Sequence, residues 1–309
     1  MAINNISKPF VIAAAATALS TGLAGYVWQE EHRPLILEIY VFALPNGRSM
    51  FIRTPEDKRI LIDGGGNSDI IREITKILPF YSRRIDAILA TNSEGKNVSG
   101  LIDVIERYKV DTSYLPAVTL ESLGLSSSTD MIYSTLVDTI NRQNIEIRKV
   151  IAGDSIILDD KVTIKPLFPA TPDRFVYSKA SAPEILFDIS FGKTAIVFLG
   201  NGSNKIQKFL ASTTAPAFTD SSVLIVSHSA LPANMSAQLI GQIKPEYLVY
   251  SKAESNKPVA PPKSSTSKTK KKEIVDPLAY LGNEKRFNLK EKGTVKITSD
   301  GVKVTVVSD

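Results

Sequence analysis

From residue 35 onward the chain alternates between short apolar runs and amphipathic stretches, the pattern of a mixed α/β protein. Apolar runs typical of strands occupy residues 35–44, 49–53, 59–62, 85–90, 110–114, 154–158, 162–168, 185–191, 194–199, 223–226, 247–250, 293–297 and 302–307. Apolar residues at helical spacing predict helices at about residues 68–78, 101–108, 129–143, 205–211, 233–243 and 276–281. Turn residues separate neighbouring strands, as at Pro45-Asn46-Gly47 and Asp300-Gly301.

These elements fall into two β-rich halves, and each half carries helices. Because a sheet or a helix must bury its apolar face against another layer, the order predicts a four-layer αββα sandwich of the α/β (α+β) class. The predicted domain covers residues 35–309 and contains an insertion at about residues 252–273. The insertion is rich in Pro, Ser, Thr and Lys and has no apolar period, so we expect a flexible surface loop there.

Ahead of this domain lies an uncharged apolar stretch at residues 10–28. A helix needs about 20 apolar residues to cross the hydrocarbon core of a bilayer. Lys8 precedes the stretch and Trp28 ends it as an interfacial aromatic, so the positive-inside rule places residues 1–9 in the cytoplasm. We therefore expect a single-pass membrane protein whose main domain is extracytoplasmic.

Two other interpretations of the apolar stretch stay open. Its richness in Ala, Thr and Gly also suits a cleaved signal peptide, which would leave a secreted protein. A buried core helix is the third alternative.

Composition narrows the chemistry. The 309 residues include no cysteine and only two histidines, His32 and His228, and the net charge is +5. Without cysteine there is neither a disulfide framework nor a thiolate metal site. Hydrolase sites for zinc or iron depend mainly on imidazole ligands, so two histidines cannot build a dinuclear centre. The modest positive charge permits an acidic partner without requiring one.

Several short motifs follow the predicted strands in a recognisable order. The most informative is Thr91–Gly100 (TNSEGKNVSG), which lies between a strand and an apolar helix. The others are Asn46–Ser49, Leu61–Gly65, Gly153-Asp154, Leu199–Asn201, Val226–Ser229 and Asn256–Pro261. In this order and spacing the chain from Glu38 to Val307 resembles the metallo-β-lactamase-like C-terminal domain of ComEC-type DNA-internalisation competence proteins.

The resemblance implies a site for zinc or another divalent metal, but most ligand positions are altered. Amide, lysine and alanine side chains stand where the family has His, Asp, His, Asp and His, namely Asn92, Lys96, Asn97, Asn201 and Ala260. Glu94 and His228 are the remaining potential ligands, and Asp63 is retained. Asn is a weak neutral ligand and a charged lysine cannot coordinate a metal. We therefore expect no metal and no catalytic residue at this degenerate site.

The role of Lys96 stays open between two interpretations. Its ammonium group could bind an anion in the place of the metal, or it could pair with Glu94 or Asp63 as a structural charge. Asp63 itself suits loop architecture as well as chemistry. A working phosphodiesterase or nuclease that uses Asp63, Glu94 and His228 with an altered metal site is the alternative to an inactive protein.

The insertion carries a second group of cations: Lys263, Lys268, Lys270, Lys271 and Lys272. They could make weak non-specific contacts with DNA or anionic lipid, or simply keep the loop solvated. No aromatic residue accompanies them for base stacking. The function that the sequence favours is binding or scaffolding, with a membrane-complex partner in DNA uptake or the cell envelope. The oligomeric state is left open.

Overall fold

The computed structural model describes residues 35–125, 131–179, 181–213, 222–227, 235–251 and 276–308. Residues 36–309 form one compact unit, distinct from residues 1–35. Several predictions lie outside the described residues: the segments 1–9 and 10–28, the insertion with its lysines, His228 and Ala260. Within the described ranges no helix has the length and apolarity needed to cross a bilayer.

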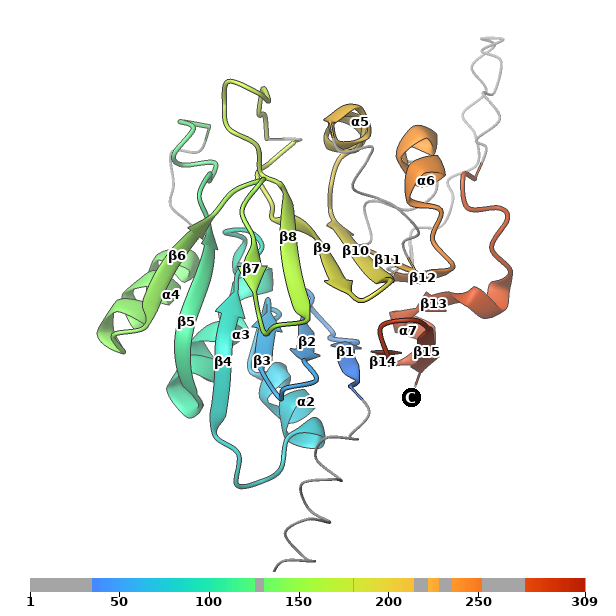
Figure 1. The fold of residues 1–309 in the computed structure, drawn as a ribbon. Coiled ribbons are helices and arrows are strands. Elements are labelled where there is room, and N and C mark those ends of the chain that lie inside the picture. Colours follow the sequence, from blue (N-terminus) through green and yellow to red (C-terminus); the bar gives the residue numbers. More distant parts are fainter. Residues whose placement is uncertain are drawn as a thin grey trace, which may run out of the picture. The chain divides into compact units, whose positions relative to one another are not determined.

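The first sheet contains eight strands in the order β15-β14-β1-β2-β3-β4-β5-β6. Their bounds are β1 Leu37–Val41, β2 Met50–Arg53, β3 Arg59–Ile62, β4 Arg84–Leu89, β5 Lys109–Pro116, β6 Glu146–Val150, β14 Val295–Ser299 and β15 Val304–Ser308. Strands β3 to β6 run parallel to one another, and the remaining pairs are antiparallel. The last two strands of the chain thus complete the sheet that the first strand begins (Figure 1).

The second sheet contains seven strands in the order β13-β12-β11-β10-β9-β8-β7. Their bounds are β7 Ile156–Ile157, β8 Val162–Phe168, β9 Leu186–Phe191, β10 Thr194–Gly200, β11 Val223–Val226, β12 Tyr247–Tyr250 and β13 Arg286–Asn288. Antiparallel pairs connect β7 to β10 and parallel pairs connect β10 to β13. Each sheet therefore begins with antiparallel strands and continues with parallel ones that need helical crossovers.

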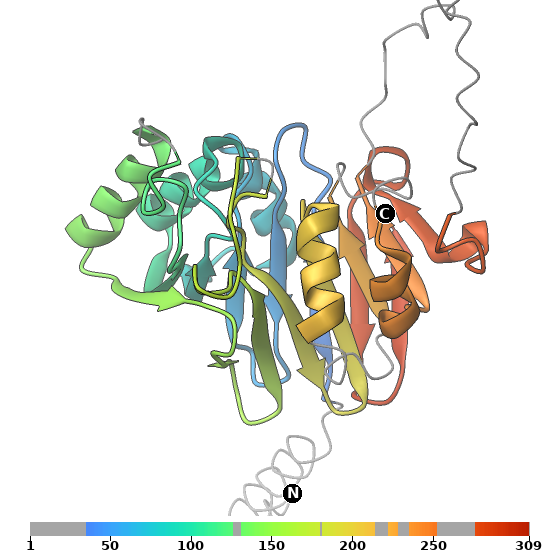
Figure 2. The ribbon, with the colours of Figure 1, turned by 90° about the horizontal axis from the view of Figure 1, so that it is seen from above.

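Helices cover the outer faces of both sheets (Figures 1 and 2). Their bounds are α2 Asp69–Ile77, α3 Gly95–Arg107 and α4 Met131–Arg142 on the first sheet, and α5 Asn204–Thr213 and α6 Ala237–Ile243 on the second. A 3₁₀ turn at Asn283–Lys285 and the short α7, Leu289–Lys292, flank β13.

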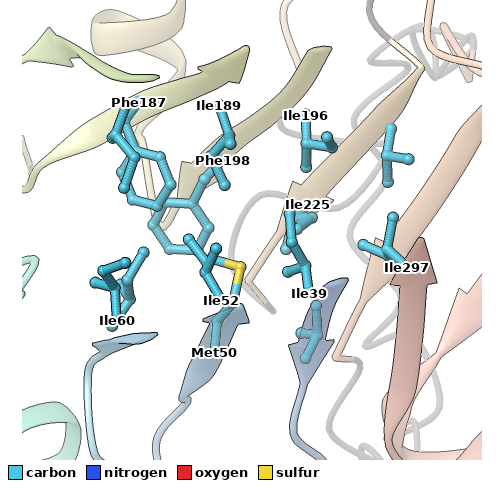
Figure 3. Packing of buried hydrophobic residues seen from close by; sticks show 14 of the residues in the cluster. Ile39, Met50, Ile52, Ile60, Phe187, Ile189, Ile196, Phe198, Ile225 and Ile297 are labelled. Carbon is cyan, nitrogen blue, oxygen red and sulfur yellow. The ribbon is translucent and has the colours of Figure 1, made fainter. Parts of the chain in front are cut away.

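Three separate apolar clusters fill the three interfaces between these four layers. The central cluster lies between the sheets and includes Ile52, Ile60, Phe187 and Phe198 (Figure 3). A second cluster joins α2, α3 and α4 to the first sheet, and a third joins α5 and α6 to the second sheet. The predicted αββα order of layers is confirmed.

Several element predictions differ from the structure. Helix α3 begins at Gly95, earlier than the predicted residue 101. Strands β6 and β13 and the short helix α7 have no counterpart among the predicted elements. The predicted helix at 276–281 is a series of turns, in which the Leu281 N–H donates to the Leu278 carbonyl and the Arg286 side chain donates to the carbonyls of Leu281 at 3.2 Å and of Leu278 at 2.5 Å.

Candidate functional site

The candidate site lies where strands of both sheets end. Asp63 follows β3, Thr91 follows β4 and Asn201 follows β10. Arg48 stands just before β2, and Glu184 stands just before β9. The loops at these strand ends therefore bring residues from both halves of the chain to one place.

The Arg48 guanidinium is the centre of this site. Its Nε donates to Asp63 Oδ2 at 2.8 Å, and its Nη1 donates to Ser227 Oγ at 3.1 Å. Its Nη2 donates to Thr91 Oγ1 and also pairs with the Glu184 carboxylate. The three charged side chains are buried, with exposed fractions of 15% for Arg48, 1% for Asp63 and 5% for Glu184. One cation thus holds two carboxylates that come from different sheets.

The face of the guanidinium is also used. Arg48 Cζ lies 5.2 Å from the centre of the Phe198 ring, within the range of a cation–π contact. Phe198 in turn stacks on Phe187 in the central apolar cluster, with ring centroids 4.8 Å apart. The ion-pair cluster therefore lies directly on the core between the two sheets.

The charges in this cluster are not balanced. Burial raises the pKa of Asp63 and of Glu184, and the neighbouring Arg48 opposes the rise. For Arg48 burial acts to lower the pKa, but the Glu184 and Asp63 carboxylates outweigh burial and raise the pKa. Since Arg48 stays protonated, two carboxylates against one cation leave an excess negative charge when both are ionised. Burial and the second carboxylate therefore both act to raise the pKa of Glu184, against the opposing charge of Arg48.

Asp63 holds the β3 and β4 ends together. Its Oδ1 accepts from the Thr91 backbone N–H at 2.8 Å, and its Oδ2 accepts from the Thr91 hydroxyl at 2.7 Å. Its own backbone N–H donates to the Leu89 carbonyl, and its carbonyl accepts from Ser49 Oγ at 2.8 Å. With a φ of 56°, Asp63 adopts the left-handed conformation that this turn requires. The structural interpretation of Asp63, as a loop-organising residue, has direct support in these contacts.

The loop after β3 packs against the start of α3 without room for side chains. The Gly64 N–H donates to the Asn97 carbonyl at 2.7 Å, and the Gly100 N–H donates to the Gly65 carbonyl at 3.1 Å. A Cβ on Gly64 would lie 2.4 Å from the Leu101 nitrogen, and one on Gly100 would lie 2.0 Å from the Gly64 carbonyl oxygen. Backbone contact between the two glycine-containing segments is what positions the 91–100 loop.

The amide residues predicted at the degenerate site bind each other. Asn97 Nδ2 donates to Asn92 Oδ1 at 3.2 Å and to Glu94 Oε2 at 3.3 Å. The Asn92 Oδ1 atom also accepts from the Glu94 backbone N–H at 3.1 Å. Both asparagines are buried, whereas the Glu94 side chain is half exposed. The Asn201 backbone N–H donates to Glu184 Oε2 at 3.1 Å, which places Asn201 beside the ion-pair cluster.

Lys96 does not enter this cluster. Its Nζ pairs with Glu94 Oε2 at 2.9 Å, and both side chains are about half exposed, at 52% and 48%. The predicted pairing of Lys96 with Glu94 is confirmed, whereas the buried cation beside Asp63 is Arg48. Arg48 and Glu184 were not among the predicted site residues. The available signal was a charged residue two positions ahead of an apolar strand start, with Arg48 before Met50-Phe51-Ile52 and Glu184 before Leu186-Phe187.

The donor set does not fit a divalent metal. No group of three His, Asp or Glu side chains among the described residues is arranged to hold an ion. The two carboxylates at the centre of the site, Asp63 and Glu184, both form ion pairs with Arg48. The neighbouring Asn92 and Asn97 side chains form a hydrogen bond with each other. A metal at this place would have to displace the guanidinium first.

A small, mainly apolar pocket of about 30 Å³ touches Arg48, Asp63 and Ser227, and two larger cavities also adjoin the cluster. The larger, of about 270 Å³, is lined by polar and cationic groups that include Arg48, Lys96, Lys290, Asn97 and Ser227. The smaller, of about 150 Å³, is lined by residues that include Glu94, Glu184 and Lys179. Asn201 lines both cavities.

Comparison with known proteins gives structural likeness only. No protein-family model and no curated protein sequence matches the chain. Among solved structures, CmlA, a diiron β-hydroxylase from Streptomyces venezuelae, matches with a TM-score of 0.48 and 14% identity over 70% of this chain and 44% of CmlA. Zn²⁺-bound PqqB from Methylobacterium extorquens matches with a TM-score of 0.47 and 12% identity over 69% of this chain and 88% of PqqB. The Rm3 metallo-β-lactamase matches with a TM-score of 0.38 and 13% identity over 61% of this chain and 74% of the enzyme.

The chain spans less than half the length of CmlA. At these sequence identities and TM-scores, the metal chemistry of the three proteins is not transferred to this chain.

Proposed function

We propose that this chain is a catalytically inactive member of the metallo-β-lactamase superfamily, similar to the ComEC C-terminal domain, with a binding or scaffolding role. The observation that carries the proposal is the buried Arg48 guanidinium held between Asp63 and Glu184. In this view Arg48 provides the positive charge that a metal ion provides in an active member of the family. The site keeps the fold together and performs no hydrolysis.

Electrostatics supports this role for Arg48. Metal-assisted hydrolysis needs an ion with several protein ligands and an open position for water. A guanidinium is always charged and cannot act as a ligand. A dication at about 4 Å from it would be repelled by roughly 8 kcal/mol at an effective dielectric constant of about 20. Bringing a metal into this cluster would therefore require Arg48 to leave.

The experiment measures metal content and hydrolysis together. The full chain, purified in detergent, is incubated with zinc, manganese or ferrous ions, desalted and examined by elemental analysis. Hydrolysis of bis(p-nitrophenyl) phosphate is followed with and without EDTA, with an active metallo-β-lactamase-fold phosphodiesterase as the positive control. We expect metal far below one equivalent and no chelator-sensitive hydrolysis. Stoichiometric metal whose removal abolishes hydrolysis would contradict the proposal.

The residues that line the larger cavity, of about 270 Å³, suit a small anionic ligand. Arg48, Lys96 and Lys290 line it, and no carboxylate among the described residues does. Asp63, Glu94 and Glu184 balance these three cations nearby, so attraction at long range is weak. A carboxylate or phosphate group would bind only by direct contact inside the cavity.

Inorganic phosphate serves as the probe for this cavity. Titration should give saturable binding that is weakened in the double variant Lys96→Gln/Lys290→Gln. The control is Lys208→Gln, an exposed lysine of α5 that does not line the cavity. Equal binding by the double variant and the control would exclude the cavity as the anion site.

We place the protein on a membrane with its main domain extracytoplasmic, linked to DNA uptake or another envelope process. The support is the apolar stretch at residues 10–28 with Lys8 before it, together with the motif resemblance. Flotation of the full chain with vesicles after alkaline extraction tests the anchor. A chain that stays in the soluble fraction would refute it.

A further inference from the structure

The loop between α2 and β4 exposes two aromatic side chains. Phe80 is 90% exposed and Tyr81 is 74% exposed, and their rings meet edge to face with centroids 5.4 Å apart. They stand away from the apolar clusters that fill the sandwich. Aromatic side chains with one polar tip or an exposed ring are typical of surfaces that meet a lipid–water interface.

Basic residues accompany the aromatic pair. Arg83 is exposed and forms no ion pair with any other described residue. Arg84 is also exposed at its tip but pairs with Asp86 and Asp111, at 3.2 and 2.6 Å. A free arginine next to two exposed rings suits an anionic headgroup layer, to which each basic side chain is attracted.

Sheet topology places this loop at the end where the domain begins. Glu38 of β1 pairs with Arg53 of β2, and Arg53 pairs with Arg59 of β3. Strand β3 runs parallel to β4, which starts at Arg84 directly after the loop. The starts of β1 and β4 therefore share one end of the sheet, three strand spacings or about 14 Å apart. Figure 1 shows the α2–β4 loop at this lower end of the sandwich.

A third exposed apolar residue lies on the other side of β1. Leu37 at the start of β1 pairs with Ser299 at the end of β14, so the β14–β15 turn is at the same end. This turn carries Val302, which is 69% exposed. The first strand thus begins between two turns that both present apolar side chains.

The length of the preceding chain limits how far this end can be from a membrane. Seven residues, 29–35, separate the apolar stretch from Ile36. A fully extended chain of that length reaches at most about 25 Å. If residues 10–28 cross a bilayer, the end of the domain that carries Phe80, Tyr81 and Val302 is held close to its surface.

We infer that the Phe80–Tyr81 loop is a second membrane contact, which docks on anionic phospholipid of the bilayer that holds residues 10–28. This inference rests on the membrane anchoring in the proposed function. Its consequence concerns orientation: Asp63, Thr91 and Asn201 lie at the opposite ends of their strands. Strand β4 alone, with six residues, separates the two ends by about 20 Å. The candidate site then faces away from the membrane, where a partner or ligand can reach it.

The natural chain contains no cysteine, so a single introduced cysteine can be labelled specifically. The full chain is reconstituted in vesicles of phosphatidylcholine and phosphatidylglycerol, with an environment-sensitive fluorophore at Tyr81→Cys. The matched control carries the same label at Ala117→Cys, an exposed position directly after β5 at the opposite end of the sheet. Quenching by spin-labelled lipid reports contact with the bilayer.

We expect strong quenching and a blue-shifted emission for the label at position 81, and neither of them for the label at position 117. Adding Phe80→Ser should weaken the quenching at position 81. Equal and low quenching at both positions in a chain that floats with the vesicles would overturn the loop contact while leaving the anchor intact. A chain that does not float would overturn the anchor, and the inference with it.

Discussion

At the scale of single residues, the site depends on which cation is buried. Lys96 is the cation that the motif draws attention to, but its ammonium lies at the surface with Glu94. Arg48 suits the buried position because its planar guanidinium has five N–H donors in a fixed arrangement. Those donors reach Asp63, Glu184, Thr91 and Ser227 at once. A lysine could not satisfy these partners from one position.

Replacing Arg48 with methionine keeps much of the side-chain volume and removes the charge. Asp63 and Glu184 would then be buried without a cation, which costs about 3–5 kcal/mol when one partner of a buried pair is removed. Urea denaturation at neutral pH measures this loss in the free energy of unfolding. The matched control is Lys96→Met, whose exposed pair with Glu94 contributes less than about 1 kcal/mol. Similar losses in both variants would argue against a special role for Arg48.

The same variant has a defined pH dependence. Burial raises the pKa of Asp63 and Glu184, and in Arg48→Met the charge that opposes the rise is gone, so that only hydrogen bonds from Thr91 and Asn201 still oppose it. When a carboxyl pKa is higher in the folded protein, the folded state binds more protons than the unfolded state. Its contribution to stability is present below the ordinary pKa of about 4 and is lost as pH rises through the raised pKa.

We therefore expect Arg48→Met to regain stability on acidification, so that its difference from the wild type narrows toward the ordinary carboxyl pKa. Urea denaturation over a series of pH values measures this. Adding Asp63→Asn and Glu184→Gln should remove the pH dependence of the variant. A difference from the wild type that stays constant with pH would show that charge burial is not the cause.

At the scale of elements, the site depends on close contact between the loop after β3 and helix α3. The sequence Gly95-Lys96-Asn97 has no apolar period, so the pattern predicts the helix only from residue 101. The helix begins at Gly95 because hydrogen bonds from Gly64 and to Gly65 fix the first turn against the sheet. Such contacts between segments are invisible in the local pattern of the chain.

Gly64→Ala tests this contact. Its Cβ would meet the Leu101 backbone nitrogen at 2.4 Å, so the loop or the helix must move. Overpacking of this kind costs about 1–3 kcal/mol. Gly241→Ala is the matched control, because Gly241 lies in α6 with open space around its Cβ position. That change should stabilise the protein by up to about 1 kcal/mol through helix propensity. Thermal and urea unfolding of both variants should shift in opposite directions.

How well each element was predicted depends on how deeply it is buried. Central strands such as β10 and β11 were predicted well, because strands buried on both faces are continuous apolar runs. Strand β6, with the sequence EIRKV, is an edge strand whose residues are mostly not buried, so its period is weak. The turns after residue 276 contact Arg286, which donates to the Asp276 carboxylate ten residues earlier and has no counterpart in the local pattern.

The candidate site was likewise predictable only where its residues belong to a local sequence motif. Asp63 and the motif around residues 91–100, which the sequence singled out, lie together in the structure. Arg48 and Glu184 were missed, because only the packing of the two sheets brings a residue before β2 beside a residue before β9. Ion pairs between layers have no fixed spacing along a chain.

At the scale of the whole molecule, the ion-pair cluster depends on the core between the sheets. Phe187 stacks on Phe198, and Phe198 carries the Arg48 guanidinium on its face. Phe187→Ala should lower the free energy of unfolding by about 3–5 kcal/mol, because it opens a cavity in the central cluster. The matched control is Phe80→Ala, whose ring is 90% exposed and should change stability very little. Chemical denaturation of the two variants checks this difference, and an equal loss in both would contradict the assignment of the central core.

In the whole molecule, the central feature is Arg48 in the place of a metal. The most direct measurement is a crystal structure of the full chain grown in the presence of zinc chloride, with anomalous diffraction at the zinc edge. We predict that the Arg48 guanidinium lies between Asp63 and Glu184, with no anomalous peak beside Asp63, Asn92, Asn97 or Asn201. A zinc ion at these residues, with Arg48 turned out toward solvent, would contradict the account.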